Sequence, residues 1–161
     1  MRYPTILNRR QWAATIALGL GSVAARAAPA TLPLAVSLPA ELAKAIKSGQ
    51  PLVVLVSLEG CPFCKVVREN YLGPMRERDG LPVVQVDMRS KLRLTELRGN
   101  TVTHDELTRT WGIKVAPTVL FFGPDGTEVA ERLVGGYIPD FYGAYLEDHL
   151  QTARAAVKKK R

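Results

Sequence analysis

Three short apolar runs along this chain have the length and composition of β-strands. The first is rich in valine and leucine and is bounded by glycine-containing turns, which predicts a strand buried on both faces. The second follows Gly80, and the third is entered through Pro117. A Gly-Pro-Asp-Gly turn at residues 123–126 then returns the chain as a partner strand. The predicted strands are residues 51–58, 81–88, 115–122 and 127–134.

Helical periodicity occupies the segments between these runs. Ser37 is a candidate N-cap with Pro39 in the first turn, and Thr103 with Glu106 forms a capping box. Residues 89–102 fit either a short hairpin or an irregular insert. The predicted helices are residues 37–48, a helix from Cys61 that Gly73-Pro74 interrupts and that can resume for a turn over residues 75–79, residues 104–111, and residues 139 to about 157. Helices alternating with strands, with a hairpin near the end, indicate an α/β fold with a central mixed sheet flanked by helices.

The first apolar run ends at Cys61-Pro-Phe-Cys64, where a turn delivers two cysteines onto the first turn of a helix. Pro62 suits the first helical position because no backbone donor is needed there. Cys61 therefore falls near the N-cap, where unpaired N–H groups and the positive end of the helix dipole favour thiolate over thiol. Cys64 lies on the same face and within bridging reach. This arrangement is the one that redox chemistry needs, and a static disulfide or two buried thiols is the structural alternative.

The net charge of +7 comes from the two ends of the chain. Residues 1–27 and residues 158–161 each carry four basic side chains and no acidic ones, whereas residues 28–157 carry 14 basic and 15 acidic side chains. Because the central domain is nearly neutral, the composition does not support nucleic-acid binding. The last four residues form a basic tail that we expect to be disordered.

The first 27 residues have the layout of an export signal. Basic residues precede an apolar stretch from Trp12 to Ala25, and residues 25–27 fit a small-x-small cleavage site. The apolar stretch is short and rich in Ala and Gly, which makes it a poor permanent span, with an uncleaved anchor as the alternative. Residues 8–12 resemble a twin-arginine signal, so this route and general secretion both stay open. The sequence predicts an exported, periplasmic protein with a signal peptide (1–27), a flexible leader (28–36), one domain (37–157) and the basic tail (158–161).

Four motifs follow one another along the central domain. They are Cys61-Pro-Phe-Cys64, Trp111-Gly-Ile-Lys-Val-Ala-Pro-Thr-Val-Leu-Phe-Phe122, the Gly-Pro-Asp-Gly turn and Gly135-Gly136. Together they resemble the thioredoxin superfamily, and within it the exported SoxW-like proteins. A C-x-x-C pair alone is moderately specific, but the Gly-Ile-x-x-x-Pro-Thr strand entry that follows makes the resemblance strong. It covers about residues 37–150 and implies a thioredoxin fold with an N-terminal helix extension and an insert before a cis-proline segment.

The resemblance implies a role for each matching residue. Cys61 matches the attacking cysteine and Cys64 the resolving cysteine, so the two would form a redox-active disulfide. Pro117 matches the proline whose preceding peptide bond is cis, although most X–Pro bonds are trans. That bond would turn the Ala116 backbone toward Cys61, where it would pair with an extended substrate strand. The residues that match the small-residue loop completing the substrate groove are Gly135 and Gly136.

Two positions depart from the thioredoxin pattern. Leu55 stands six residues before Cys61, where thioredoxins have a buried Asp that carries the proton of the second cysteine. Glu59 is the nearest carboxylate in the sequence and the candidate proton carrier, with an exposed turn residue as the alternative interpretation. The Pro62-Phe63 dipeptide is closer to the Pro-Tyr of glutaredoxins than to the Gly-Pro of thioredoxins, which keeps glutathione as a minor substrate option.

The resemblance therefore implies a thiol:disulfide oxidoreductase without a cofactor. We expect it to reduce disulfides in periplasmic proteins and to be re-reduced by a membrane thiol transporter, because the histidine that makes DsbA strongly oxidising is missing between the cysteines. An oxidant or isomerase-like role is the alternative, and no stable membrane insertion is expected once the signal is removed. An intact cysteine pair argues against a non-catalytic thioredoxin-like binding domain. Metal handling is a further alternative. Its four candidate ligands are Cys61, Cys64, His104 and His149, and the two histidines do not have the spacing of metal ligands.

Overall fold

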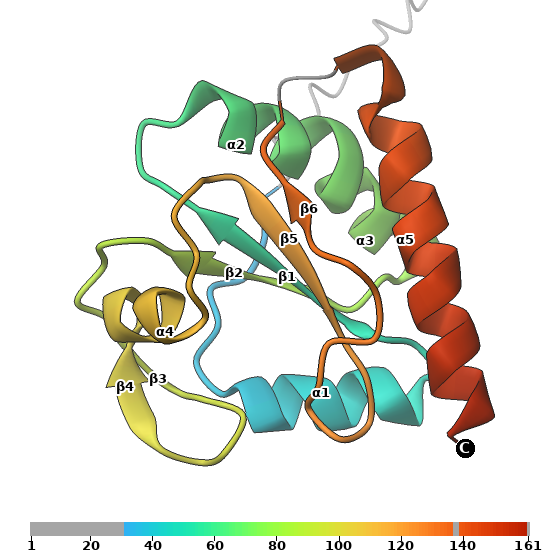
Figure 1. Ribbon diagram of the computed structural model, residues 1–161, viewed down its shortest axis with the longest axis horizontal. Helices are drawn as coiled ribbons and strands as arrows, with labels where there is room; N and C mark the ends of the chain where they lie inside the picture. Colours follow the sequence, from blue (N-terminus) through green and yellow to red (C-terminus); the bar gives the residue numbers. More distant parts are fainter. Residues whose placement is uncertain (1–30, 137–138, 161) are drawn as a thin grey trace, which may run out of the picture.

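The computed structural model describes residues 31–136 and 139–160, in which a mixed sheet lies between helices (Figure 1). The strands lie in the order β2-β1-β5-β6, with β1 parallel to β2 and antiparallel to β5, and β5 antiparallel to β6. The predicted α/β fold with a central mixed sheet flanked by helices is confirmed. In chain order the elements are α1 (Leu38–Lys47), β1 (Leu52–Ser57), α2 (Pro62–Val66), the π-helical η1 (Val67–Leu72), α3 (Gly73–Asp79), β2 (Val83–Asp87), β3 (Arg93–Thr95), β4 (Thr101–Thr103), α4 (His104–Thr110), β5 (Thr118–Phe122), β6 (Leu133–Val134) and α5 (Pro139–Lys159).

Strand β1 lies at the centre of two hydrophobic cores, and all six of its residues are buried. Side chains alternate across a strand, so Val54 and Val56 enter one core, whereas Val53 and Leu55 enter the other. The first core includes residues of α1 and α4, and the second includes residues of η1 and α5. Replacing a fully buried leucine of these cores by alanine would lower the free energy of unfolding by about 2–5 kcal/mol.

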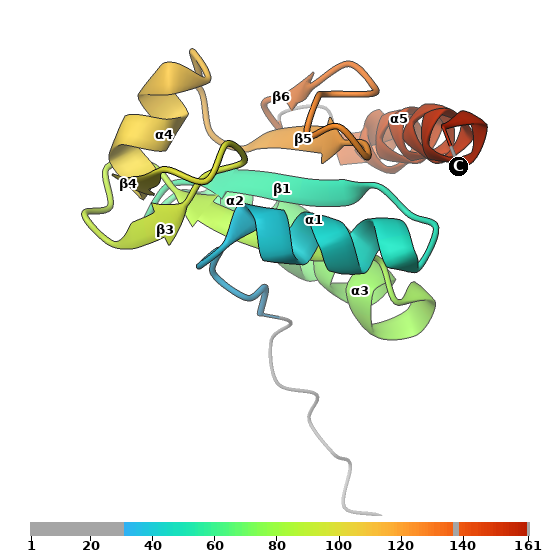
Figure 2. The same cartoon turned by 90° about the horizontal axis from the view of Figure 1, so that it is seen from below.

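Residues 89–102 contain a hairpin, which decides between the two alternatives left open by the sequence. Strands β3 and β4 pair antiparallel, with Arg93 opposite Thr103. Helix α4 begins directly after β4, and the predicted capping box is present: Thr103 N–H donates to Glu106 Oε2 at 2.7 Å, and Glu106 N–H donates to Thr103 Oγ1 at 3.2 Å. The hairpin and α4 lie on the side of the molecule opposite to α5 (Figure 2).

The helix that begins after Cys61 continues past Gly73-Pro74, so the predicted interruption there is wrong. The turn before Pro74 widens into the π-helical η1, and Gly73 N–H donates to Arg68 O, five residues back. Proline has no N–H and its ring crowds the carbonyl four residues before it. A π-turn moves the hydrogen bonds before Pro74 to a longer spacing, which makes room for the proline ring.

The N-terminal arm, residues 31–36, packs on the edge of β2, so the flexible-leader prediction is wrong for this part. Gln85 N–H donates to Pro33 O, and Ala35 N–H donates to Gln85 O, both at 2.8 Å. Leu32 and Ala35 are buried in the two cores. Residues 28–30, and the predicted signal peptide over 1–27, lie outside the described residues.

The return strand after the Gly-Pro-Asp-Gly turn is shorter than the predicted 127–134. Gly126 N–H donates to Gly123 O at 2.9 Å, so the turn forms as expected. Glu128 pairs with Phe122, but Leu133 then pairs with Val119, which leaves two extra residues on the return side. This bulge interrupts the pairing and leaves only β6 as regular strand.

Helix α5 extends two residues beyond the predicted end, and its Leu146, Leu150 and Ala153 are fully buried. Its last turn includes Lys158 and Lys159, and Lys160 forms an ion pair with Asp125. The prediction of a disordered tail is therefore wrong for residues 158–160. Over residues 31–136 and 139–160, we find no helix with the length and apolar content that crossing a membrane requires.

The His104 side chain is buried and forms hydrogen bonds to two separate segments. Only 1% of the residue is exposed. Its Nδ1 accepts from the Asp87 N–H at 3.0 Å, and its Nε2 lies 3.1 Å from Ala35 O. Because Nδ1 accepts from an N–H, the ring proton resides on Nε2, which donates to the carbonyl. A neutral imidazole therefore joins the end of β2 to the N-terminal arm.

Burial lowers the pKa of His104 below its ordinary value of 6.5. The folded state then binds fewer protons than the unfolded state near that pH, so stability rises with pH there. We expect the free energy of unfolding to be fully established above about pH 6.5 and to fall as the pH drops toward the folded pKa. Urea denaturation between pH 7 and pH 5 measures this effect. A His104→Gln variant keeps His149, so an unchanged pH slope in this variant would contradict the assignment to His104.

Candidate active site

Cys61 caps the helix that follows β1, as the sequence predicted. Its backbone is extended (φ −79°, ψ 112°), and its Sγ accepts from the Cys64 N–H at 3.1 Å. Pro62 occupies the first turn, where the missing N–H carries no penalty. The sulfur therefore lies where the first unpaired donors of the helix converge, which stabilises negative charge on it.

Cys61 and Cys64 form a disulfide with their Cα atoms 5.3 Å apart. Cys64 is fully buried, whereas Cys61 is half-buried. An incoming sulfur can therefore reach Cys61 more readily than Cys64. This difference gives the two cysteines unequal roles in any exchange reaction.

The peptide bond between Ala116 and Pro117 is cis, and it faces the disulfide. The Ala116 carbonyl oxygen lies 3.8 Å from Cys61 Sγ. The Pro117 carbonyl accepts from the Gly135 N–H at 2.8 Å, which ties the glycine pair to this turn. The structure thus brings together Cys61, Cys64, Ala116, Pro117 and Gly135.

Gly136 packs closely against Pro117 and Phe63, next to the cysteine pair. A Cβ atom at Gly136 would lie 3.1 Å from Pro117 Cγ and 3.4 Å from Phe63 Cβ, closer than most side-chain contacts. Gly135 needs its glycine for a different reason, because its φ of 83° is strained for other residues. We call the surface formed by Ala116, Pro117, Gly136 and Phe63 the substrate groove. Four exposed apolar side chains belong to the same segments: Phe63, Val66, Val115 and Val134.

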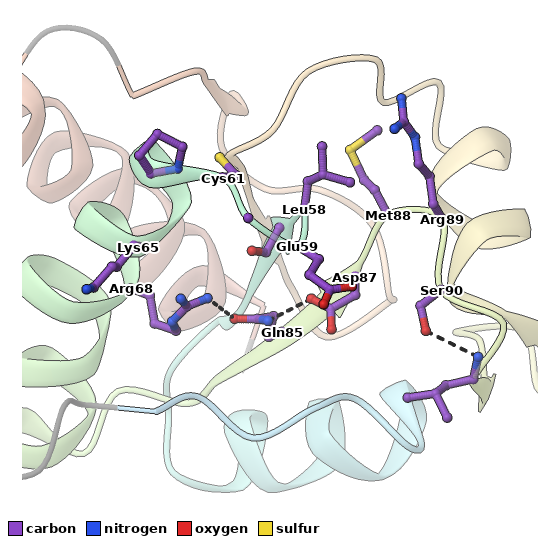
Figure 3. A pocket seen from close by; sticks show the side chains of 14 residues that line it. Leu58, Glu59, Cys61, Lys65, Arg68, Gln85, Asp87, Met88, Arg89 and Ser90 are labelled. Atoms are coloured by element: carbon purple, nitrogen blue, oxygen red, sulfur yellow. Dashed lines mark hydrogen bonds between the residues drawn. The ribbon is translucent and has the colours of Figure 1, made fainter.

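A cleft of about 1070 Å³ also opens beside Cys61. In Figure 3, Cys61, Lys65 and Arg68 lie on one side of it, and Met88, Arg89 and Ser90 lie on the other. The residues that line it are Ser57, Leu58, Glu59, Gly60, Cys61, Pro62, Lys65, Arg68, Gln85, Asp87, Met88, Arg89, Ser90 and Leu92. The cleft and the substrate groove share no residue, although both adjoin Cys61.

Inside the cleft, Gln85 connects Arg68 to Asp87, as the dashed lines in Figure 3 show. Arg68 Nη1 donates to Gln85 Oε1 at 3.1 Å, and Gln85 Nε2 donates to Asp87 Oδ1 at 2.7 Å. The sequence analysis did not single out these residues. The signal was present, because Gln85 and Asp87 are polar residues at alternate positions of an otherwise apolar strand.

Leu55, which stands where thioredoxins have the proton-carrying Asp, lies in an apolar environment in the structure. Leu55 is fully buried in the second core, beneath the cysteines' helix. Glu59 is exposed and lines the cleft with Cys61, and Asp87 is a second carboxylate there. The role of Glu59 as proton carrier stays a prediction.

The histidines of the metal-handling alternative do not gather at the cysteines. Both ring nitrogens of His104 bond to backbone groups, and His149 Nδ1 lies 2.7 Å from Glu131 O. Within the described part of the chain, no group of three or more His, Cys, Asp or Glu side chains is placed to hold a metal ion. The geometry gives this alternative no support.

Comparisons with known proteins agree with the fold. A family model for a thioredoxin-like domain matches residues 38–150. The solution structure of a thioredoxin from Thermus thermophilus has 21% sequence identity and a TM-score of 0.51, over 79% of this chain and 91% of that one. A mutant thioredoxin from Halobacterium salinarum has 22% identity and a TM-score of 0.47, over 77% and 95%. The periplasmic thioredoxin SoxS from Paracoccus pantotrophus has 19% identity and a TM-score of 0.42, over 65% and 99%.

Among curated proteins, none matches the sequence. The match to the family model nevertheless spans well over half of the chain, and the cis-proline and the cysteine pair stand where the resemblance placed them. The likeness to the Thermus thermophilus structure concerns the same fold. The chain therefore belongs to the thioredoxin-like domain family and has the thioredoxin fold.

Proposed function

We propose that this protein is an exported thiol:disulfide oxidoreductase that reduces disulfides in periplasmic proteins. The observation that carries the proposal is the position of Cys61: its sulfur caps a helix, is partly accessible, and lies 3.8 Å from the Ala116 carbonyl beside the substrate groove. A thiolate stabilised in this way is both a nucleophile and a leaving group. Buried Cys64 then acts as the internal partner that ends each cycle.

The reaction consists of two exchange steps. The Cys61 thiolate attacks one sulfur of the target disulfide, forming a mixed disulfide and releasing the other target sulfur as a thiolate. The Cys64 thiolate then attacks Cys61 Sγ, which releases the second target sulfur and forms the Cys61–Cys64 disulfide. Two electrons pass from this protein to the target, and a membrane thiol transporter returns them by the reverse exchange.

The substrate groove supports a polypeptide as the target. The Ala116 backbone beside Cys61 is available to an extended chain, and Gly136, packed closely against Pro117 and Phe63, keeps bulk off this surface. The periplasmic location is supported by the export-type pattern of residues 1–27. The near-neutral charge of residues 28–157 supports protein targets over nucleic acid.

Disulfide exchange predicts distinct behaviour for the two cysteine variants. The Cys61→Ser variant should lose insulin reduction with dithiothreitol, because it lacks the attacking thiolate. The Cys64→Ser variant should also fail to turn over, but it should accumulate a mixed disulfide with insulin, visible by non-reducing electrophoresis and mass spectrometry. Wild-type activity retained by Cys61→Ser would overturn the proposal.

A reductant role predicts a low reduction potential for the Cys61/Cys64 pair. We expect a value closer to that of thioredoxin, about −270 mV, than to that of the strong periplasmic oxidant, about −120 mV. Equilibration in glutathione buffers followed by thiol alkylation measures it. A potential near −120 mV would favour the oxidant role over the reductant role, and the proposed exchange chemistry would still hold.

The substrate groove predicts that Gly136→Val weakens polypeptide binding. A valine there would press against Pro117 and Phe63 and change the shape of this surface. We expect KM for insulin to rise about tenfold, or about 1.4 kcal/mol of lost binding. The rate with hydroxyethyl disulfide, which is too small to need the groove, serves as the internal control. An unchanged KM for insulin would show that targets bind elsewhere.

A further inference from the structure

One wall of the cleft beside Cys61 is a single connection, residues 87–92, between β2 and the hairpin. Five of its six residues line the cleft. The connection is held from the active-site side by one bond, in which Met88 N–H donates to Ser57 O at 2.8 Å. At its crest Arg89 adopts a left-handed φ of 64°, which is uncommon for a residue other than glycine. A wall with this backbone needs support from behind.

His104 supplies that support from three directions. Its ring accepts from the Asp87 N–H at the start of the wall, and its own backbone N–H donates to Leu92 O at the end of the wall, at 3.0 Å. On its other side, Nε2 lies 3.1 Å from Ala35 O in the N-terminal arm. With 1% exposure, the imidazole is fixed and has no contact with solvent. The imidazole therefore holds the start of the wall at Asp87, whereas the backbone N–H of His104 holds its end at Leu92.

The composition of the cleft indicates what it would hold. Its lining combines three basic and two acidic side chains with apolar Leu58, Met88 and Leu92. Neither a single ion nor a purely apolar molecule matches such a mixed surface, whereas a peptide segment does. Because Cys61 lines the cleft and its sulfur lies 3.8 Å from Ala116 O of the substrate groove, a target chain joined to Cys61 has both surfaces within reach.

We infer that the cleft binds the segment of the target polypeptide that flanks its disulfide on the side away from the substrate groove, and that His104 is the positioning residue for this half of the substrate site. This inference rests on the proposed function. It adds a second half to the substrate site. It also gives a role at that site to His104, which the sequence placed only within a helix-capping segment. The imidazole acts through Asp87, the backbone N–H of His104 holds Leu92, and neither group touches the reacting sulfurs.

Two substitutions at His104 can each keep one of the two hydrogen bonds of the imidazole and remove the other. Asparagine places an acceptor near the position of Nδ1 and can keep the Asp87 bond, whereas glutamine places a donor near Nε2 and can keep the Ala35 bond. With insulin as substrate, we expect His104→Gln to raise KM about threefold to tenfold, the range that one lost hydrogen bond supplies, with kcat unchanged. His104→Asn should remain near the wild type. Rates with hydroxyethyl disulfide should be equal in all three proteins.

A purely structural role for His104 predicts a different pattern. Each variant loses one buried hydrogen bond, so both would change KM in proportion to their loss of thermal stability. That outcome, or an unchanged KM in His104→Gln, would overturn the inference. Failure of the wild type to reduce insulin would overturn the proposed function itself, and the inference with it.

A surface variant tests the wall without risk to folding. Leu92 lines the cleft and is 57% exposed, so Leu92→Ala should leave the protein folded while raising KM for insulin severalfold. Leu34→Ala is the matched control, because Leu34 is also an exposed leucine but does not line the cleft. Equal KM values for the two variants would show that the target does not enter the cleft, and would overturn the inference even if the His104 variants fail to fold.

Discussion

The active site depends on how β1 pairs with its two neighbours. Strand β5 runs antiparallel to β1, with Val56 opposite Thr118, so the end of β1 meets the start of β5. Strand β2 runs parallel to β1, with Ser57 opposite Asp87, so the end of β2 reaches the same edge. Register in a sheet with two buried faces is strongly specified, because a shift of one residue would turn every core side chain to the wrong face. The cysteine turn, the cis-proline and the cleft are therefore held at one edge by the packing of β1.

This placement gives Cys61 two different surroundings. On the β5 side it faces the Ala116 carbonyl, beside the surface where Gly136 packs against Pro117 and Phe63. On the β2 side it faces a cleft of mixed charge, in which Gln85 links Arg68 to Asp87. The N-terminus of α2 favours negative charge on Cys61 Sγ. One sulfur of the pair is thus partly accessible, whereas the other is fully buried.

The chain differs from the usual thioredoxin arrangement in where its polar groups are buried. Leu55 replaces the buried carboxylate and contributes to the second core instead, so no charge has to be accommodated beneath the cysteines. His104 is a buried polar residue of this protein, and its ring is satisfied by backbone groups of the arm and of β2. It closes the exposed edge of β2 together with the N-terminal arm, which covers an edge that would otherwise offer unpaired backbone groups to other chains.

Much of the fold and most of the active site could be predicted from local patterns. The position of Cys61 at a helix start follows from the apolar run before it and Pro62 after it, and the capping box at Thr103 marks the start of α4. Such signals depend on residues close in the sequence, where backbone hydrogen bonding and steric restrictions act directly. The cis bond at Pro117 came from the family resemblance, because local chemistry alone favours trans.

Contacts between distant segments were decided only by the tertiary structure. The leader and the tail lack periodicity, yet the arm gains two backbone bonds to Gln85, and Lys160 gains an acidic partner more than thirty residues away in sequence. The helix passes Pro74 because a π-turn keeps its packed face in place, and no local rule requires such a turn. His104 carries no sequence signal of its role, since its partners lie 17 and 69 residues away and meet only when β2, the arm and α4 pack together. Sequence alone determined which residues could perform sulfur chemistry, and packing decided which surfaces surround them, because burial and register are properties of the whole sheet.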